Sequence, residues 1–281
     1  GKQYSNGGFE TLGQFLESLT PEQLQAFHSA QRVWPLPGSK CPGALFVGPH
    51  LAAWPRALAE LGITHVLCLT QELPRFRPVQ QQLEHVPLDD EPHEDLLGRL
   101  DHAVEWINNA VMAGGQVLCH CRAGRSRSAA VATAFLVSRE GCSAEAAIEH
   151  IRSERPFVDI NPGFERQLRD FTESRAQGAV LPGIPRNANC ELCRLERVTP
   201  WLEETEAFVV LLCDQCDGPM AVWRRHTMLL SKAEREEMRE ALTRHADLHL
   251  GAGNWYLDEL QRTIHDHIHW HARPHTARSR A

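Results

Sequence analysis

The sequence predicts an α/β fold for its first part, followed by a smaller α+β domain. Two observations predict this order. Up to about residue 175, short apolar runs alternate with segments of helical periodicity, a pattern typical of a mostly parallel sheet flanked by helices. After residue 189 the chain instead carries two CxxC pairs, one long helical segment and a strand-like run rich in histidine.

Four segments follow from these patterns: a helical extension over residues 1–40, an α/β domain over 41–175, a linker over 176–189 and a second domain over 190–281. The linker is placed where Gly, Pro and Asn cluster and apolar periodicity stops.

The helices and strands up to residue 176 are expected in the following order. Within residues 1–40 we expect two short helices, the second of which begins with a capping box formed by Thr20 and Gln23. Strands are expected at 44–48, 64–70, 83–88 and 116–121, and helices at 52–62, 94–115, from about 127, 143–155 and 161–176.

Charge and composition exclude some classes of protein. The formal net charge is −7, so the molecule as a whole is not expected to bind polyanions generally. No apolar run approaches the roughly 20 residues of a membrane span, so we expect no such span. The nine cysteines, several in CxxC pairs, favour reduced thiols and therefore an intracellular protein, cytoplasmic or nuclear.

The stretch QVLCHCRAGRSRS predicts a site for a nucleophile and a phosphate. Cys121 would end a central strand, and a helix would begin near Arg127. The loop between them would surround the helix N-terminus, where backbone N–H groups and the helix dipole favour an anion. The same surroundings favour a thiolate. Gly124 would let the loop amides turn inward, and Arg127 would offer two donors to phosphate.

Residues 120–128, HCRAGRSRS, resemble the HC-x5-R-S signature of cysteine-dependent phosphatases, and residues 44–171 are similar to the dual-specificity subfamily. The resemblance implies a cysteine-phosphatase fold and phosphomonoester hydrolysis through a phosphocysteine. Cys121 would attack phosphorus, Arg127 would bind the equatorial oxygens, and Ser128 would assist departure of the thiolate. His120 would help set the pKa of the Cys121 thiol from behind the loop. The phosphate-binding residues implied are Arg122, Ala123, Gly124, Arg125, Ser126 and Arg127.

A general acid must protonate the leaving oxygen. The resemblance implies an aspartate from the loop after the preceding strand, where VPLDDEP offers Asp89 and Asp90. Spacing from Pro87 makes Asp90 the better match, with Asp89 as the second choice.

Arg122 and Arg125 leave the substrate open. Basic residues at these two places are similar to those of lipid phosphatases, so they suit a phosphoinositide or another polyphosphorylated molecule. If their side chains instead face solvent or pair with acidic residues, a phosphoprotein is the expected substrate.

The second domain is expected to bind a structural zinc ion. CELC (190–193) and CDQC (213–216) form a CxxC…CxxC set, which is typical of a tetrahedral site. If the segments after Thr199 and Glu206 pair as a hairpin, Cys193 lies near Cys213. The predicted ligands are Cys190, Cys193, Cys213 and Cys216.

HDHIHWHARP, residues 265–274, alternates strictly, so its histidines would share one face of a strand. The row resembles the H-x-H-x-H of the histidine-triad (HIT) nucleotide-binding superfamily, over roughly residues 190–274. The resemblance implies a HIT-like domain in which His269 attacks the α-phosphate of a nucleotide. It also implies a second-ranked zinc set: Cys190, Cys193, His226 and His267. His265, Trp270 and DGPMAV, where the superfamily has a glycine–histidine pair, depart from that pattern.

Three functions therefore remain open. In the first, a dual-specificity-type phosphatase is coupled to a HIT-like nucleotide-binding domain. In the alternative, the HIT-like domain processes or binds nucleotides or nucleic-acid ends, and the phosphatase domain acts on nucleotide or RNA phosphates or recruits the target. A second domain without chemistry, serving as a structural or partner-binding platform, is the third reading.

Overall fold

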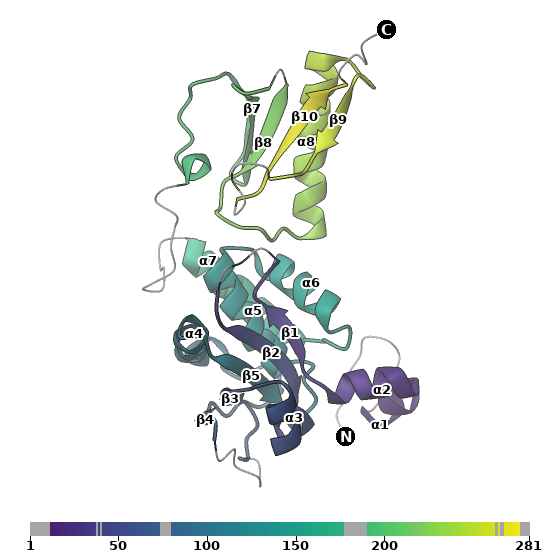
Figure 1. Cartoon of the computed structure of the whole chain (residues 1–281), viewed down its shortest axis with the longest axis vertical. Helices are drawn as coiled ribbons and strands as arrows, with labels where there is room; N and C mark the ends of the chain where they lie inside the picture. The colour runs from purple at the N-terminus through teal and green to yellow at the C-terminus, as the bar shows by residue number, and fades with distance from the viewer. Residues whose placement is uncertain are drawn as a thin grey trace. The chain divides into compact units, whose positions relative to one another are not determined.

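The computed structural model describes residues 12–37, 39, 41–73, 80–176, 190–216, 218–261, 264 and 267–275. The chain divides into two compact units (Figure 1). The first takes in most of the chain up to residue 181, and the second takes in the chain from residue 182 together with residues 140–147. Residues 177–189 of the expected linker, and His265, lie outside the described residues.

The first unit contains a five-stranded sheet of order β1-β2-β5-β3-β4. Strand β1 pairs antiparallel with β2, and the other pairs are parallel. This mixed sheet agrees with the mostly parallel sheet predicted. The central strands β2 and β5 are buried almost throughout, as expected where helices cover both faces of a sheet. The strands are β1 (Gln31–Trp34), β2 (Ala44–Pro49), β3 (His65–Cys68), β4 (Gln82–His85) and β5 (Gln116–Cys121).

Helices flank this sheet (Figure 1). The helix that follows β5, α5, is buried from Ser128 to Ser138, so its first turn lies inside the unit. The helices of this part of the chain are α1 (Leu12–Glu17), α2 (Pro21–His28), the 3-10 helix η1 (His50–Ala53), α3 (Pro55–Glu60), α4 (Leu97–Met112), α5 (Arg127–Glu140), α6 (Ala144–Glu154) and α7 (Pro162–Ala176).

The N-terminal segment is part of the first unit's sheet. The capping box of α2 is present as predicted: the Gln23 N–H donates to the Thr20 hydroxyl, and the Thr20 N–H donates to the Gln23 side chain. The boundary expected after residue 40 does not separate a structural unit, because β1 pairs with β2. Sequence analysis missed β1, since QRVW is four residues long and shows no alternation of apolar and polar residues.

The second unit is an antiparallel sheet of order β6-β7-β8-β10-β9 with one long helix, α8 (Lys232–Leu250). The predicted capping box at Ser231 and Glu234 opens α8. One face of the sheet packs on α8 through a core that includes Phe208, Trp223 and Trp270. Leu192, Leu195 and Trp201 pack against Val209, Leu211, Met220 and Val222, which form a second apolar cluster. The remaining elements are the 3-10 helix η2 (Glu191–Cys193), β6 (Trp201–Glu204), β7 (Phe208–Leu212), β8 (Pro219–Trp223), β9 (Trp255–Asp258) and β10 (His269–Pro274).

Among the helices that the structure describes, none is both long enough and apolar enough to cross a bilayer.

Candidate functional site

The loop between β5 and α5 is a compact turn that ends at a helix N-terminus. β5 ends at Cys121 and α5 begins at Arg127. Gly124 has a φ of +66°, and a Cβ on it would lie 2.5 Å from the carbonyl carbon of Gly48 on β2. A side chain at this position would therefore be strained and would also clash with the backbone of β2. The glycine allows the loop to curl over the first turn of α5.

The Cys121 side chain is buried at the centre of this loop. Its sulfur accepts a hydrogen bond of 3.3 Å from the Gly124 N–H and lies 3.3 Å from the Ser128 hydroxyl oxygen. Hydrogen bonds from N–H and O–H groups favour a charged sulfur over a neutral one. The sulfur therefore lies among donors, as a nucleophilic thiolate requires.

Arg127 lies beside the loop with its guanidinium held in place. Its Nη1 donates to the Leu88 carbonyl at 3.0 Å, and its Nε lies 3.7 Å from Oδ2 of Asp90. Nε is buried and makes no hydrogen bond to any described residue. A guanidinium fixed in this way retains a donor for an anion bound in the loop.

Asp90 contacts the loop, whereas Asp89 is exposed. The Ser126 hydroxyl donates to Oδ1 of Asp90 at 2.6 Å, and the Asn161 amide donates to the same oxygen at 3.0 Å. Oδ1 thus accepts two hydrogen bonds, which leaves Oδ2 as the oxygen that can carry a proton. Of the two candidates, Asp90 is the one that the structure brings to the loop.

Two residues at the start of α7 fix the position of Asp90. Asn161 caps this helix, since its Oδ1 accepts the Phe164 N–H at 2.9 Å, while its Nδ2 donates to Asp90. A Cβ on Gly163 would lie 1.9 Å from the Pro92 carbonyl oxygen, so the aspartate loop packs directly against the helix N-terminus. Sequence analysis identified NPG as a helix start but did not link it to the acid.

Arg155 is a residue of this site that sequence analysis missed. Its side chain is fully buried, and it donates to the Gly124 carbonyl at 2.7 Å and to the Ala123 carbonyl at 3.1 Å. It also donates to the carbonyls of Phe27 and Ser29 and to the side chain of Gln31. By binding these carbonyls, Arg155 fixes the orientation of two peptide groups of the loop. Burial lowers the pKa of Arg155 to about 10, so it remains charged at neutral pH.

His120 lies behind the loop as expected, but it is uncharged at neutral pH. Burial lowers the pKa of its imidazole to about 4. Its Nδ1 lies 3.5 Å from the Cys121 carbonyl oxygen, and its Nε2 has no hydrogen-bond partner among the described residues. A neutral imidazole cannot support the Cys121 thiolate by positive charge.

The two additional arginines of the loop differ. Arg125 pairs with Asp159 at 2.9 Å, and its guanidinium lies 4.3 Å from the centre of the Phe15 ring. Its side chain is 13% exposed. Arg122 is exposed. Arg125 therefore has protein partners of its own, and Arg122 is the one that faces solvent.

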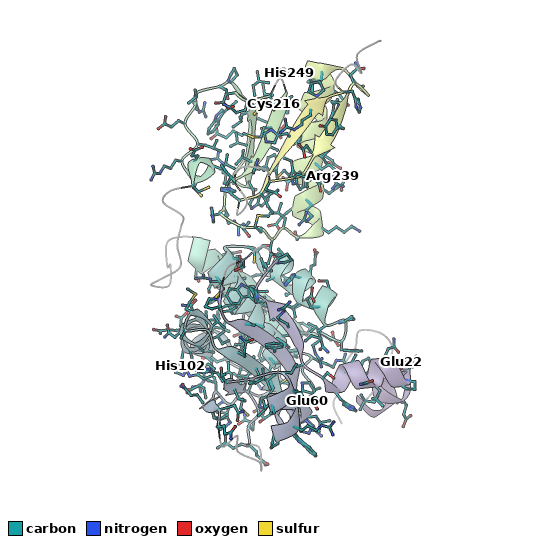
Figure 2. The ribbon with its side chains drawn as sticks, viewed as in Figure 1. Glu22, Glu60, His102, Cys216, Arg239 and His249 are labelled. Carbon is teal, nitrogen blue, oxygen red and sulfur yellow. The ribbon has the colours of Figure 1, made fainter. Side chains whose placement is uncertain are left out.

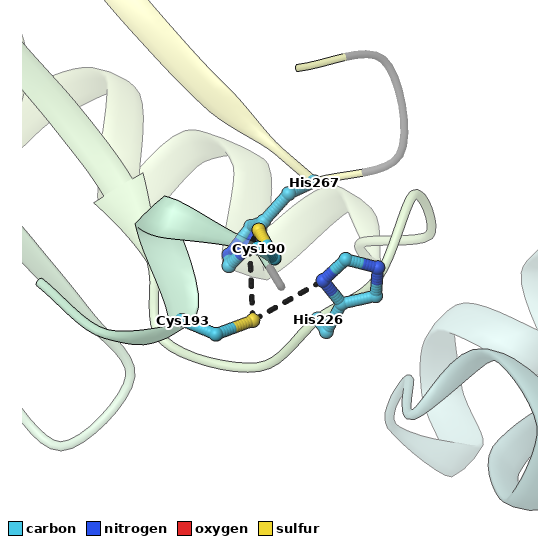
Figure 3. Close-up of side chains that lie close together, drawn as sticks. All are labelled: Cys190, Cys193, His226 and His267. Atoms are coloured by element: carbon cyan, nitrogen blue, oxygen red, sulfur yellow. Dashed lines mark hydrogen bonds between the residues drawn. The ribbon is translucent and has the colours of Figure 1, made fainter. Parts of the chain in front are cut away.

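In the second unit, Cys190, Cys193, His226 and His267 lie together (Figure 3). The Cys190 sulfur is 3.2 Å from Nδ1 of His267, and the Cys193 sulfur is 3.2 Å from Nδ1 of His226. The four ligand atoms lie within 4.8 Å of one another. Nε2 of His267 donates to the Trp223 carbonyl at 2.6 Å, so the neutral ring presents the lone pair of Nδ1 to the two sulfurs. Two thiols and two imidazoles suit a tetrahedral zinc ion.

The structure does not bring the four cysteines together, which corrects the predicted ligand set. Cys213 and Cys216 form a separate group with His271. They lie in the turn between β7 and β8, whereas His226 follows the other end of β8. The chain after Cys193 crosses one face of the sheet before β6 begins, and residues such as Leu195 pack on that face. The hairpin expected around Trp201 is present, but this crossing carries Cys193 away from Cys213.

His269 lies on β10 between His267 and His271 in the sequence and is largely buried. Its Nδ1 donates to the His267 carbonyl at 2.9 Å. Because Nδ1 carries the proton in the neutral ring, Nε2 has the lone pair. The ring centre of His269 lies 5.4 Å from that of His271.

Comparison with known proteins agrees with the geometry of the loop. The family described as "dual specificity phosphatase, catalytic domain" matches residues 45–174. Dual specificity phosphatase 28 of Homo sapiens is 38% identical over 143 residues, which are 50% of this chain and 81% of that protein. Dual specificity protein phosphatase 12 of Homo sapiens is 42% identical over 132 residues, which are 46% of this chain and 39% of that protein.

Solved structures give similar matches. The crystal structure of human DUSP28 has 34% identity and a TM-score of 0.47, and the match covers 52% of this chain and 95% of that one. The crystal structure of DUSP15 has 26% identity and a TM-score of 0.48, and the match covers 53% of this chain and 91% of that one. Each of these matches covers about half of the chain.

Proposed function

This chain belongs to the dual-specificity phosphatases, and from that premise we propose that Cys121 is the nucleophile of a two-step phosphomonoester hydrolysis. The observation that carries the proposal is the convergence of the Cys121 sulfur, the Arg127 guanidinium and the Asp90 carboxyl on one loop at the N-terminus of α5. In the first step the thiolate attacks phosphorus, the S–P bond forms, and the P–O bond to the leaving group breaks. Arg127 and the loop N–H groups bind the phosphoryl oxygens.

Asp90 is assigned as the general acid. The leaving oxygen takes a proton from Oδ2, while the Ser126 and Asn161 donors hold Oδ1 in place. In the second step a water molecule attacks the phosphocysteine, gives its proton to the Asp90 carboxylate, and displaces the Cys121 thiolate. The Ser128 hydroxyl, 3.3 Å from the sulfur, donates to the departing thiolate.

The contacts of Arg125 favour a substrate with one phosphate in the loop, such as a phosphoprotein. Because Arg125 pairs with Asp159 and stacks on Phe15, it is not arranged to bind a second phosphate. A phosphoinositide or another polyphosphorylated substrate would depend on Arg122, whose exposed cation contributes little binding energy in water.

The nucleophile is tested by Cys121→Ser in the full chain. We expect hydrolysis of an aryl phosphate to fall by at least about a thousandfold, as is typical when a covalent nucleophile is removed. The matched control is Cys142→Ser, a second buried cysteine outside the loop, which should keep most of the activity. Trapping of a phosphocysteine at any cysteine other than Cys121 would contradict the assignment.

The acid is tested by comparing Asp90→Ala with Asp89→Ala on aryl phosphates of graded leaving-group pKa. Loss of the general acid should cost about 100-fold or more for the poorest leaving group and much less for the best. The exposed Asp89 should behave as wild type. If Asp89→Ala shows the leaving-group dependence instead, the acid has been misassigned.

For the second unit we propose a structural zinc ion bound by Cys190, Cys193, His226 and His267. The support is the donor set itself: two thiolates balance the charge of Zn²⁺, and two imidazole nitrogens complete four ligands. Elemental analysis of Cys193→Ser should show loss of this zinc. Retention of all bound metal in that variant would contradict the proposal.

The orientation of His269 favours a second candidate function, a HIT-like nucleotide-binding unit. Nδ1 donates to a backbone carbonyl, so Nε2 is the nitrogen that could attack an α-phosphate. The test is transfer of radiolabel from an α-labelled nucleotide to the full chain, with His269→Ala as the comparison. The nucleophile role fails if the two proteins label equally, or if neither does.

A further inference from the structure

A second group of potential metal ligands lies in the second unit, at the turn between β7 and β8. Cys213, Cys216 and His271 place their ligand atoms within 4.8 Å of one another, and the Cys216 sulfur is 3.2 Å from Nδ1 of His271. We propose that these three residues bind a second zinc ion, whose fourth position is open to water or another exchangeable ligand.

The turn that carries the two cysteines is fixed by its own backbone bonds. The Cys213 N–H donates to the Gly218 carbonyl at 3.1 Å, and the Gly218 N–H donates to the Cys216 carbonyl at 2.8 Å. The Gln215 N–H donates to the Cys213 sulfur at 3.4 Å. These bonds fix the positions of the two thiols within the turn.

The third ligand comes from β10, and the packing of the turn explains why it is close. A Cβ on Gly218 would lie 2.1 Å from the Ala272 carbonyl oxygen, so the turn and β10 touch through the backbone. The register between β8 and β10 agrees with this contact, because His271 pairs with Met220, two residues after Gly218. His271 is 9% exposed, so its ring enters the group from inside the unit.

The two groups are separate sites rather than parts of one. His267 belongs to the first group and His271 to the second. Four residues of extended chain span roughly 13 Å, too far for one ion to reach both histidines. Each group contains two thiols, and after loss of their protons the two thiolates would balance the charge of one Zn²⁺.

The ligand count distinguishes the two sites chemically. The first group offers four ligands, which is typical of a structural site, and the second offers three among the described residues. Two cysteines and one histidine with an exchangeable fourth ligand are typical of zinc sites that do chemistry. The ring centre of His269 lies 5.4 Å from that of His271, so His269 is a direct neighbour of this second group.

Metal content of the full chain, purified with zinc present, tests the proposal. We expect two zinc ions per chain in the wild type and in Cys41→Ser, a control in neither group. Cys216→Ser and His271→Asn should each keep one ion, Cys193→Ser should keep one, and Cys193→Ser with Cys216→Ser should keep none. One ion in the wild type that is lost in both single cysteine variants would overturn the proposal, because it would indicate a shared site.

The open position is tested with cobalt. In Cys193→Ser, which isolates the second site, Co²⁺ should give thiolate charge-transfer bands, and azide should shift the d–d bands. Unchanged d–d bands over the full range of azide concentration would show a closed fourth position and refute that part of the proposal.

Alkylation keeps the proposal testable if a variant fails to fold. In the wild type, Cys213 and Cys216 should resist alkylation until zinc is removed by a chelator, and mass mapping then locates the label. Equal labelling with and without chelator, or a Cys213–Cys216 disulfide in protein kept reduced throughout, would overturn it.

Discussion

Cysteine and histidine side chains gather in both units, but the atoms around the sulfurs differ. In the first unit the Cys121 sulfur receives an N–H from Gly124 and lies beside the Ser128 hydroxyl. In the second unit the sulfurs of Cys190 and Cys193 lie beside imidazole nitrogens. Donors around one sulfur suit an anionic ligand, whereas paired thiols and imidazoles suit a cation.

The two sites also differ in the contacts that stabilise their shape. The phosphate loop is shaped by Gly124 and by the hydrogen bonds of its carbonyls to Arg155, all of which are contacts within the protein. The cysteine–histidine groups instead bring thiols and imidazoles together, and such groups bind a metal ion through thiolates and neutral imidazoles. We therefore expect the first unit to be stable alone and the second to depend on its ligand. The predictions that follow test this contrast, from the largest expected effect to the smallest.

Removal of zinc should have the largest effect, and it should be confined to one unit. Structural zinc in small domains contributes on the order of 10 kcal/mol to folding. A strong chelator should therefore abolish hydrogen-exchange protection in α8 and β8 but leave α5 protected. Aryl phosphate hydrolysis should change by less than about twofold. Equal loss of protection in both units would break the comparison.

Arg155→Met should have the next largest effect, confined to the first unit. It leaves the Ala123 and Gly124 carbonyls without their donor, and a buried polar group left unpaired typically costs about 1–3 kcal/mol. We expect kcat/KM for an aryl phosphate to fall by at least about 100-fold, with zinc content unchanged. Arg152→Gln, a partly exposed neighbour paired with Glu165, is the control and should stay within about threefold. A fully active Arg155→Met would mean that the loop holds its own shape.

His120 should make the first unit sensitive to acid. Its folded-state pKa is lowered to about 4 by burial, whereas an unfolded histidine titrates near 6.5. The unfolded chain therefore binds this proton first, so stability is full above about pH 6.5 and declines as the pH falls towards 4. Protonation of His120 should lower the free energy of unfolding by about 3 kcal/mol in total.

The loss of stability is measured by denaturant unfolding of the first unit at pH 7 and at pH 4.5. Hydrogen exchange of β5 monitors the unfolding. In His120→Gln the difference between the two pH values should shrink by most of that amount. His102→Gln, whose side chain is 63% exposed, should keep the wild-type difference. An unchanged pH difference in His120→Gln would show that other groups cause the acid sensitivity.

Arg122→Gln should have the smallest effect. Because the side chain is exposed, we expect kcat/KM for a polyphosphorylated substrate to fall by no more than about fivefold, and that for an aryl phosphate not to change. Arg125→Gln should instead lower both values together, since it breaks the pair with Asp159. A loss of tenfold or more confined to the polyphosphorylated substrate in Arg122→Gln would restore that substrate class as the leading one.

Local patterns accounted for much of the fold and of the loop. The sequence 120–128 fixes a strand, a turn and a helix start in one run, so Cys121, Arg127 and Ser128 could be located without a structure. The capping boxes at Thr20 and Ser231 were equally local. These features depend on residues a few positions apart, which a sequence displays directly.

Features that depend on distant segments were not predictable in the same way. Arg155 bonds to Gly124, which lies 31 residues earlier in the sequence, and to Phe27, which lies 128 residues earlier. The sequence around Arg155 does not mark it as buried. The spacing of the CxxC pairs suggested a single metal site, because spacing alone does not show which path the chain takes between the two pairs. In the structure the first pair lies with His226 and His267, and the second pair lies with His271.

The contacts of Arg155 have a consequence for where the phosphatase unit can be cut. The family match begins at residue 45, and a fragment designed on it would start there. Three of the five acceptors of Arg155 lie earlier, at Phe27, Ser29 and Gln31. Such a fragment would also lose β1, leaving the edge of β2 bare. The segment that the family match covers is therefore smaller than the segment that we expect to fold alone. The residues before the match belong to the enzyme although they carry no catalytic motif.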